Sequence, residues 1–168
     1  INLLLTHLNF TNKAELTKSI PKEVFKLSNL KFLRIYSYIN TLQPDIKKLK
    51  KLTFLDIRCN NLTKIPKEIG QLLKLKQLII CGRKINKIPK EIGQLENLTD
   101  LIIHKTSITY IPREIGNLSN LTLLLLHYNQ LVTVPKELGK LRKLKTLALD
   151  HNNLTFLPRE IFQLGNDI

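Results

Sequence analysis

The sequence has no methionine or tryptophan, only two cysteines, and no long run of uncharged apolar residues. Two cysteines cannot form the disulfide framework of a small secreted scaffold. Lys, Asp, Asn or His interrupts every apolar run before the roughly 18 residues that a transmembrane helix needs, so such a helix is excluded. Because the chain starts at Ile1 and lacks methionine, we expect that a leader was removed or that the chain was trimmed. We expect secretion or cell-surface exposure after leader removal, and a cytoplasmic location stays open.

Acidic residues are scarce: 13 Asp and Glu stand against 27 Lys and Arg, which gives a formal net charge of +14. A basic surface attracts acidic proteins and anionic polymers. Many lysines fall in short clusters, of which Lys47, Lys48, Lys50 and Lys51 form one. Aromatic residues do not interleave with these clusters, so specific nucleic-acid recognition is not expected. The charge either keeps a leucine-rich chain soluble or serves contact with an anionic polymer or acidic surface.

One 23-residue pattern fills the chain. It reads L-x-x-L-x-L-x-x-N-x-L-x-x-I-P-x-x-I-x-x-L-x-x and is clearest from Leu52 to Leu72. Leucine and isoleucine, with 35 and 20 copies, supply most of its fixed positions. The first leucine of each unit falls at Leu5, Leu30, Leu52, Leu75, Leu98, Leu121 and Leu144. We therefore expect a single repeat domain over residues 1–168, because seven units leave no room for another.

Each unit predicts a short strand followed by a helical turn. The segment L-x-x-L-x-L has the period of two that is typical of a strand with one buried face. Proline recurs at or near the same place in six units, as Pro66 and Pro89 do, and suits the start of a helical turn. One unit cannot bury its apolar face alone, so the units should stack. The expected fold is an α/β repeat solenoid, a curved horseshoe with a parallel β-sheet on the concave face and short 3₁₀ or α turns on the convex face.

These residues resemble the leucine-rich repeat proteins of the 23-residue class over the whole chain. The lysine-rich variant with Pro-Lys-Glu-Ile-Gly is similar to small exported leucine-rich repeat proteins of pathogenic spirochaetes. The resemblance implies a bacterial, secreted, protein-binding scaffold with a role in host interaction or virulence. In this class an asparagine ties adjacent turns together. We expect Asn60, Asn129 and Asn152 to do so here, whereas Arg83 and Thr106 replace it in the middle units.

The strand residues that point away from the core should form three ladders across the sheet. By alternation they are the third, fifth and seventh residues of each unit, and neighbouring strands lie about 4.8 Å apart. Apolar residues gather there beside aromatic and arginine residues, a combination typical of binding surfaces. The predicted partner-binding residues of the concave face are Phe32, Arg34, Tyr36, Phe54, Asp56, Arg58, Ile79, Ile102, Leu123 and Leu125. We expect a protein ligand of unknown identity there, and self-association into a homo-oligomer stays open.

A second set of concave residues can ligate metal. Cys81, His104, His127 and Asp150 follow one another on adjacent strands, and two imidazoles one strand apart could reach a common Zn²⁺. No recognised metal motif accompanies them, so we expect no cofactor, with an adventitious zinc ion as the alternative. Cys59 and Cys81 lie on neighbouring units, which leaves a disulfide open, although their side chains should point differently.

Catalytic motifs are missing: the sequence has no G-x-S-x-G, no P-loop and no glycine-rich loop that opens a helix. Cys81 beside His104 resembles a nucleophile and its base, but an open sheet offers neither a water-excluding pocket nor an oxyanion hole. We therefore expect no enzymatic activity. The first hypothesis is a module that binds a host or cellular protein through the concave face. The others are a basic adhesive surface for anionic polymers, such as glycosaminoglycan or a membrane surface, and a self-assembling repeat protein.

Overall fold

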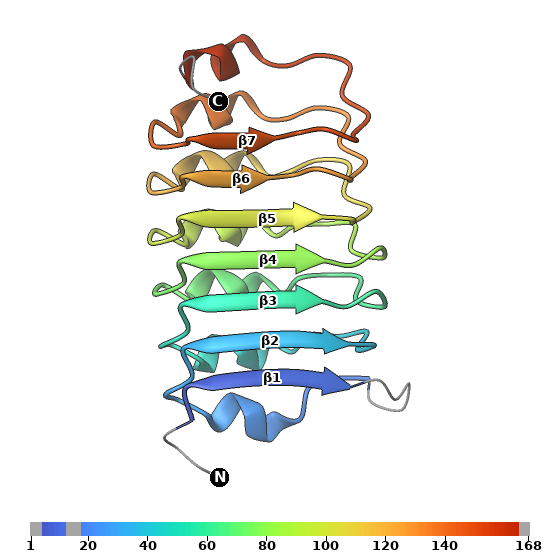
Figure 1. Cartoon of the computed structure of the whole chain (residues 1–168), viewed down its shortest axis with the longest axis vertical. Helices are drawn as coiled ribbons and strands as arrows, with labels where there is room; N and C mark the ends of the chain where they lie inside the picture. The colour runs from blue at the N-terminus through green and yellow to red at the C-terminus, as the bar shows by residue number, and fades with distance from the viewer. Residues whose placement is uncertain (1–4, 13–17, 165–168) are drawn as a thin grey trace.

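The computed structural model describes residues 5–12 and 18–164. Within these ranges the chain forms seven parallel strands in one sheet, ordered as they occur in the sequence (Figure 1). The strands are β1 (His7–Asn12), β2 (Phe32–Ser37), β3 (Phe54–Arg58), β4 (Gln77–Cys81), β5 (Asp100–His104), β6 (Leu123–Leu125) and β7 (Thr146–Ala148). A short 3₁₀ helix follows each strand: η1 (Lys22–Lys26), η2 (Pro44–Lys48), η3 (Lys67–Gln71), η4 (Lys90–Gln94), η5 (Arg113–Asn117), η6 (Lys136–Lys140) and η7 (Arg159–Leu164). The predicted repeat solenoid is confirmed, and the helical turns of the described residues are 3₁₀.

The strands pair in the register that the repeat predicts. One column runs from His7 through Phe32, Phe54 and Gln77 to Asp100. Successive members are 25, 22, 23 and 23 residues apart, which equals the intervals between the unit starts. The longer first unit and the shorter second unit therefore absorb their length differences outside the strands.

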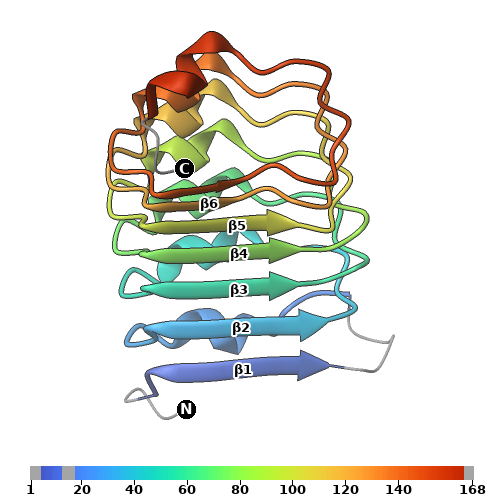
Figure 2. The same ribbon diagram turned by 45° about the horizontal axis from the view of Figure 1, so that its top comes forward.

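The hydrophobic core lies between the sheet and the row of 3₁₀ turns behind it (Figure 2). Leu55 and Ile57 of β3 are fully buried on the inner face of the sheet. Ile69 and Leu72, at the 3₁₀ turn of the same unit, are fully buried as well. A single unit offers only these few apolar side chains, so its stability comes from contact with the units on either side.

Proline and glycine shape the 3₁₀ turns. Pro66 directly precedes η3 with φ of −68°, and its carbonyl accepts a hydrogen bond from the N–H of Ile69 at 3.1 Å. The missing N–H of proline leaves no bond unmade at such a start. The glycine of each Ile-Gly or Leu-Gly pair lies against the next unit: a Cβ on Gly93 would lie 2.3 Å from the carbonyl oxygen of Glu114. Glycine therefore allows consecutive turns to approach each other closely.

The loops that follow the strands are of two kinds. At the end of β2, and directly after β3 and β4, the eighth residue of the unit is small and buried; these residues are Ser37, Cys59 and Gly82. After β5, β6 and β7 the eighth residue is exposed and has a positive φ, which is 51° at Lys105, 55° at Tyr128 and 52° at His151. This left-handed residue turns the ninth residue of the unit inward. The loop type changes between β4 and β5.

Asn129 ties adjacent turns together as predicted. It is buried, and its Oδ1 accepts hydrogen bonds from the backbone N–H and the hydroxyl of Thr106 at 3.0 and 2.6 Å. Its Nδ2 donates to the carbonyls of Ile103 and Leu126 at 2.7 and 2.8 Å. Asn152 does the same one unit later, and its Nδ2 donates to the same Leu126 carbonyl at 2.8 Å.

The prediction for Asn60 was wrong. After β3 the extended chain continues the alternation, so Cys59 points inward, with its Sγ 3.6 Å from the carbonyl oxygen of Ile35, and Asn60 is exposed. The next unit passes close to this loop: a Cβ on Gly82 would lie 2.3 Å from the carbonyl oxygen of Cys59. The first loop type therefore depends on small buried residues instead of on an asparagine.

Candidate functional site

The solvent-facing side of the sheet, here called the concave face, presents the predicted ladders. The fifth-position ladder, paired in register across all seven strands, is Asn9, Arg34, Asp56, Ile79, Ile102, Leu125 and Ala148. The third-position ladder is equally continuous, whereas the paired part of the seventh ends at His104 because β6 stops at Leu125. The structure thus places the ten predicted partner-binding residues side by side on β2 to β6.

An apolar row crosses the middle of the concave face. Ile79 pairs with Ile102, which pairs with Leu125, and Leu123 lies on the same face two residues before Leu125. Each of the four side chains is half-buried, because its ladder neighbours cover its flanks. The apolar patch is therefore contiguous, as the ladders predict. It exposes less apolar area than four fully solvated side chains would.

Two stacked phenyl rings lie on β2 and β3, near the N-terminal side of the concave face. Phe32 and Phe54, here called the aromatic shelf, stack with ring centroids 4.1 Å apart and an interplanar angle of 4°. His7 stacks on Phe32 at 5.4 Å. The guanidinium carbon of Arg34 lies 4.8 Å from the Phe32 centroid and 5.5 Å from that of Phe54. This cation–π contact fixes the arginine beside the shelf.

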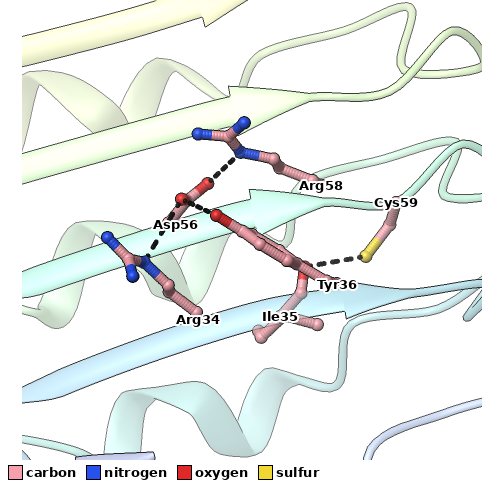
Figure 3. A network of polar contacts seen from close by, with 6 residues as sticks. All are labelled: Arg34, Ile35, Tyr36, Asp56, Arg58 and Cys59. Atoms are coloured by element: carbon pink, nitrogen blue, oxygen red, sulfur yellow. Dashed lines mark hydrogen bonds and ion pairs between the residues drawn. The ribbon is translucent and has the colours of Figure 1, made fainter. Parts of the chain in front are cut away.

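Next to the shelf lies a charged group of four side chains, the Asp56 cluster, made of Arg34, Tyr36, Asp56 and Arg58 (Figure 3). The Tyr36 hydroxyl donates to Oδ2 of Asp56 at 2.8 Å, and Nε of Arg58 donates to Oδ1 at 3.0 Å. Nε of Arg34 lies 3.7 Å from Oδ2, as an ion pair without a hydrogen bond. The Asp56 side chain is 1% exposed, whereas those of Arg34 and Arg58 are 42% and 47% exposed.

The pKa values of two members of the cluster, Tyr36 and Arg58, are raised. Burial and the hydrogen bond to Asp56 raise the pKa of Tyr36, so its hydroxyl stays a donor. The hydrogen bond to Asp56 raises the pKa of Arg58 further above its usual range. Sequence reasoning placed Asp56 on the solvated face and missed its burial. The available signal was the position of arginines beside it, since Arg34 is its ladder neighbour and Arg58 follows two residues later on the same face.

The four predicted metal ligands do not come together. Cys81 and His104 pair in register, and the rings of His104 and His127 are 5.3 Å apart. Asp150 is exposed and contacts His151 instead. Within the described part of the chain, no group of three or more His, Cys, Asp or Glu side chains is placed to hold a metal ion. A zinc ion bridging the two histidines stays a prediction.

The two cysteines are both free thiols on opposite faces of the sheet. Cys59 is in the core and Cys81 is on the concave face, which is the difference in direction that the alternation predicts. Burial raises the pKa of the Cys59 thiol to about 12. Burial also raises the pKa of Cys81, against the opposing effect of the Arg58 charge. Neither thiol is poised to act as a nucleophile, since the thiolate is the reactive form.

Lysines gather on the side of the molecule that carries the turns. An open groove there is lined by Lys64, Ile65, Lys67, Asn86, Lys87, Ile88, Pro89, Lys90, Glu91, Tyr110 and Pro112. Its four lysines are exposed and belong to two copies of Lys-Ile-Pro-Lys, at residues 64–67 and 87–90. Sequence reasoning missed this groove, although the repeated tetrapeptide was a visible signal for it. We call it the lysine groove.

Comparisons with known proteins agree with this architecture. The family model described as Leucine Rich Repeat matches residues 51–72 and 143–164. A leucine-rich repeat protein of Leptospira interrogans is 30% identical, with a TM-score of 0.76, over 98% of this chain and 47% of that one. The leucine-rich repeat ectodomain of the Arabidopsis thaliana receptor kinase GASSHO1/SCHENGEN3, solved in complex with CASPARIAN STRIP INTEGRITY FACTOR 2, is 33% identical, with a TM-score of 0.78, over 95% and 20%. The TLR13–ssRNA13 complex matches with 25% identity and a TM-score of 0.82, over 96% of this chain and 24% of that one.

The chain spans less than half the length of each of these three structures. No curated protein matches it. Among the residues that the structure describes, none of the helices has the length and apolar character to span a membrane.

Proposed function

Because the chain is a leucine-rich repeat protein that resembles those of spirochaetes, we propose that it is a non-catalytic scaffold that binds a protein partner through its concave face. One observation carries this proposal. An apolar row, an aromatic shelf and a fixed charged cluster lie side by side on an open sheet. Aromatic, apolar and arginine side chains are the groups that dominate binding energy in protein interfaces.

The relatives support binding as the role of this fold. The receptor kinase ectodomain was solved with a bound factor and TLR13 with RNA, so such solenoids accept macromolecular ligands. The resemblance to the Leptospira interrogans protein supports a bacterial origin. Action outside the cell, in contact with a host, is part of this proposal. The apolar row supports a protein ligand in this case, because a run of apolar side chains offers nucleic acid no basic group along that part of the face. We propose no cofactor for this role.

The test is a single charge in the middle of the apolar row. Ile102→Glu places a carboxylate on the concave face without touching the core, because Ile102 is half-buried and points away from it. Leu73→Glu is the matched control, since Leu73 is 55% exposed in the loop after η3, away from the concave face. Both variants should keep the circular dichroism spectrum of the wild type.

We expect immobilised wild type and Leu73→Glu to capture the same protein from host or cell extract, and Ile102→Glu to lose it. A charge desolvated in an apolar contact costs several kcal/mol, which reduces affinity by about 100-fold or more. Capture of that protein by Ile102→Glu at wild-type affinity would show that the concave face is not the binding surface.

The lysine groove supports a second candidate function, adhesion to an anionic polymer or membrane surface. Four exposed lysines and one glutamate line it, which leaves a local excess of positive charge. The double change Lys64→Glu and Lys87→Glu should weaken retention on heparin and reduce its salt dependence. Lys47→Glu with Lys51→Glu changes the net charge equally at another place. Equal losses from the two double variants would show that net charge acts instead of the groove.

A further inference from the structure

We propose that the Asp56 cluster and the aromatic shelf together recognise a carboxylate that lies next to an aromatic side chain on the partner. This inference rests on the proposed function and adds the chemistry of one part of the bound segment. Its starting point is the way in which the two arginines contact Asp56, because that contact leaves their outer nitrogens available.

Both arginines meet Asp56 through Nε. Nε of Arg58 donates to Oδ1, and Nε of Arg34 faces Oδ2. In Figure 3 the contacts of both guanidinium groups with the carboxylate run from Nε, and none is drawn from an Nη atom. No residue in the described ranges accepts a hydrogen bond from these Nη atoms. Two guanidinium groups around one buried anion therefore direct their free donors toward solvent.

The cluster is ready for a second anion. With Tyr36 protonated, its side chains carry two positive charges and one negative charge. Asp56 fixes the position of Arg58, and Phe32 and Phe54 fix that of Arg34. Little side-chain freedom is lost when such pre-positioned groups bind, which favours affinity. A planar carboxylate matches the fork of a guanidinium group better than a spherical ion does.

The aromatic shelf specifies what should accompany the carboxylate. Phe32 and Phe54 are half-buried, so part of each ring remains open to a ligand. They contact Arg34 directly, at 4.8 and 5.5 Å from the guanidinium carbon. An anion bound at the arginines thus lies beside the rings, where an attached aromatic group would gain apolar and ring contacts. An isolated inorganic anion would use only half of this site.

The probe for this site is 3-phenylpropanoate, which carries one carboxylate close to one phenyl ring. Titration is followed by NMR through the Nε–Hε signals of Arg34 and Arg58 in the intact chain. We expect both signals to shift and saturate with a Kd of about 1 mM, ordinary for so small a ligand. The neutral analogue 3-phenylpropanamide should bind about 10-fold more weakly, because it lacks the charge-assisted bonds. Acetate and sulfate, which lack the ring, should also bind more weakly.

The variant Arg34→Gln should reduce the affinity for 3-phenylpropanoate about 10-fold. It is preferred over Arg58→Gln because Arg34 makes no hydrogen bond to Asp56, so its loss disturbs the buried carboxylate less. Arg83→Gln, at an exposed position after β4, is the control and should bind like the wild type. Circular dichroism confirms that both variants are folded.

Four results would overturn the proposal: no saturable shift, equal binding of the amide, equal binding of sulfate or acetate, or unchanged affinity in Arg34→Gln. These failures differ from failure of the proposed function. Loss of partner capture in Ile102→Glu together with no probe binding would leave the concave face as the binding surface and remove only this carboxylate site. Probe binding without any effect of Ile102→Glu on partner capture would keep the carboxylate site and show that the captured protein binds elsewhere.

Discussion

Asn129 offers a sharp test of how the turns are held together. The change Asn129→Ala removes a buried side chain that makes four hydrogen bonds to the backbone and to Thr106. Asn60 occupies the same position of the repeat but is exposed, because the loop after β3 is of the other type. The same substitution at two equivalent positions therefore has different expected effects.

The expected magnitude follows from the bonds that are lost. A typical intramolecular hydrogen bond contributes about 1 kcal/mol net, so four of them suggest a loss of about 4 kcal/mol in the free energy of unfolding. The Ile103 carbonyl and the Thr106 N–H lose a buried partner, which adds to the penalty, whereas the Leu126 carbonyl keeps the hydrogen bond from Asn152. For Asn60→Ala, a surface substitution, we expect a change within about 0.5 kcal/mol.

Urea unfolding followed by far-ultraviolet circular dichroism measures both values. With a slope of about 2 kcal/mol/M, Asn129→Ala should lower the urea midpoint by about 2 M, while Asn60→Ala should leave it in place. Since each unit contacts only its neighbours, the loss should be concentrated around β5 to β7, which hydrogen exchange can locate.

Equal destabilisation by Asn60→Ala and Asn129→Ala would refute this reasoning, because both asparagines would then hold their turns in the same way. A midpoint of Asn129→Ala within about 0.25 M of the wild type, or about 0.5 kcal/mol, would refute it as well. Variants with intact circular dichroism at zero urea are required for either conclusion.

Three further predictions concern glycine, cysteine and histidine. Gly93→Ala should lower the free energy of unfolding by about 1–3 kcal/mol, since its Cβ would lie 2.3 Å from a carbonyl oxygen of the next unit; thermal melting against Gln94→Ala, an exposed neighbour, checks this. A thiol reagent should modify Cys81 slowly and Cys59 only after unfolding, because burial raises both pKa values, as mass spectrometry with and without urea can show. Burial lowers the pKa of His104, so this histidine binds a proton more readily in the unfolded chain than in the folded one. The free energy of unfolding should therefore fall as the pH falls from about 6.5 toward the pKa of the folded state. His104→Gln should remove that part of the pH dependence of the urea midpoint.

The fold and the outline of the site were predictable from the repeat. The period of two in L-x-x-L-x-L fixes which side chains face the core, and the interval between units fixes which residues pair. Phe32, Phe54 and Ile102 therefore lie where the sequence predicts. No knowledge of side-chain conformation was needed for these assignments, because alternation in a parallel sheet determines them.

The errors arose where two local preferences compete. Asn60 matches the repeat, but the chain continues as a strand and buries Cys59 instead. Nothing in the consensus pattern specifies where the extended conformation ends. The burial of Asp56 depends on three side chains of two strands closing over it, and such rotamer-level packing is not encoded in the repeat period.

The change of loop type between β4 and β5 limits where an additional repeat unit can be inserted into the chain. A copy of the β6 unit inserted before β7 would find an inward asparagine on the next unit, as it does now. The same copy inserted between β2 and β3 would meet Ser37 and Cys59, which belong to the other loop type. Its buried amide would lose partners, at about 1–3 kcal/mol for each unmatched polar group. We therefore expect duplication of 23-residue units to be tolerated within one half of the solenoid and penalised across the boundary between the two loop types.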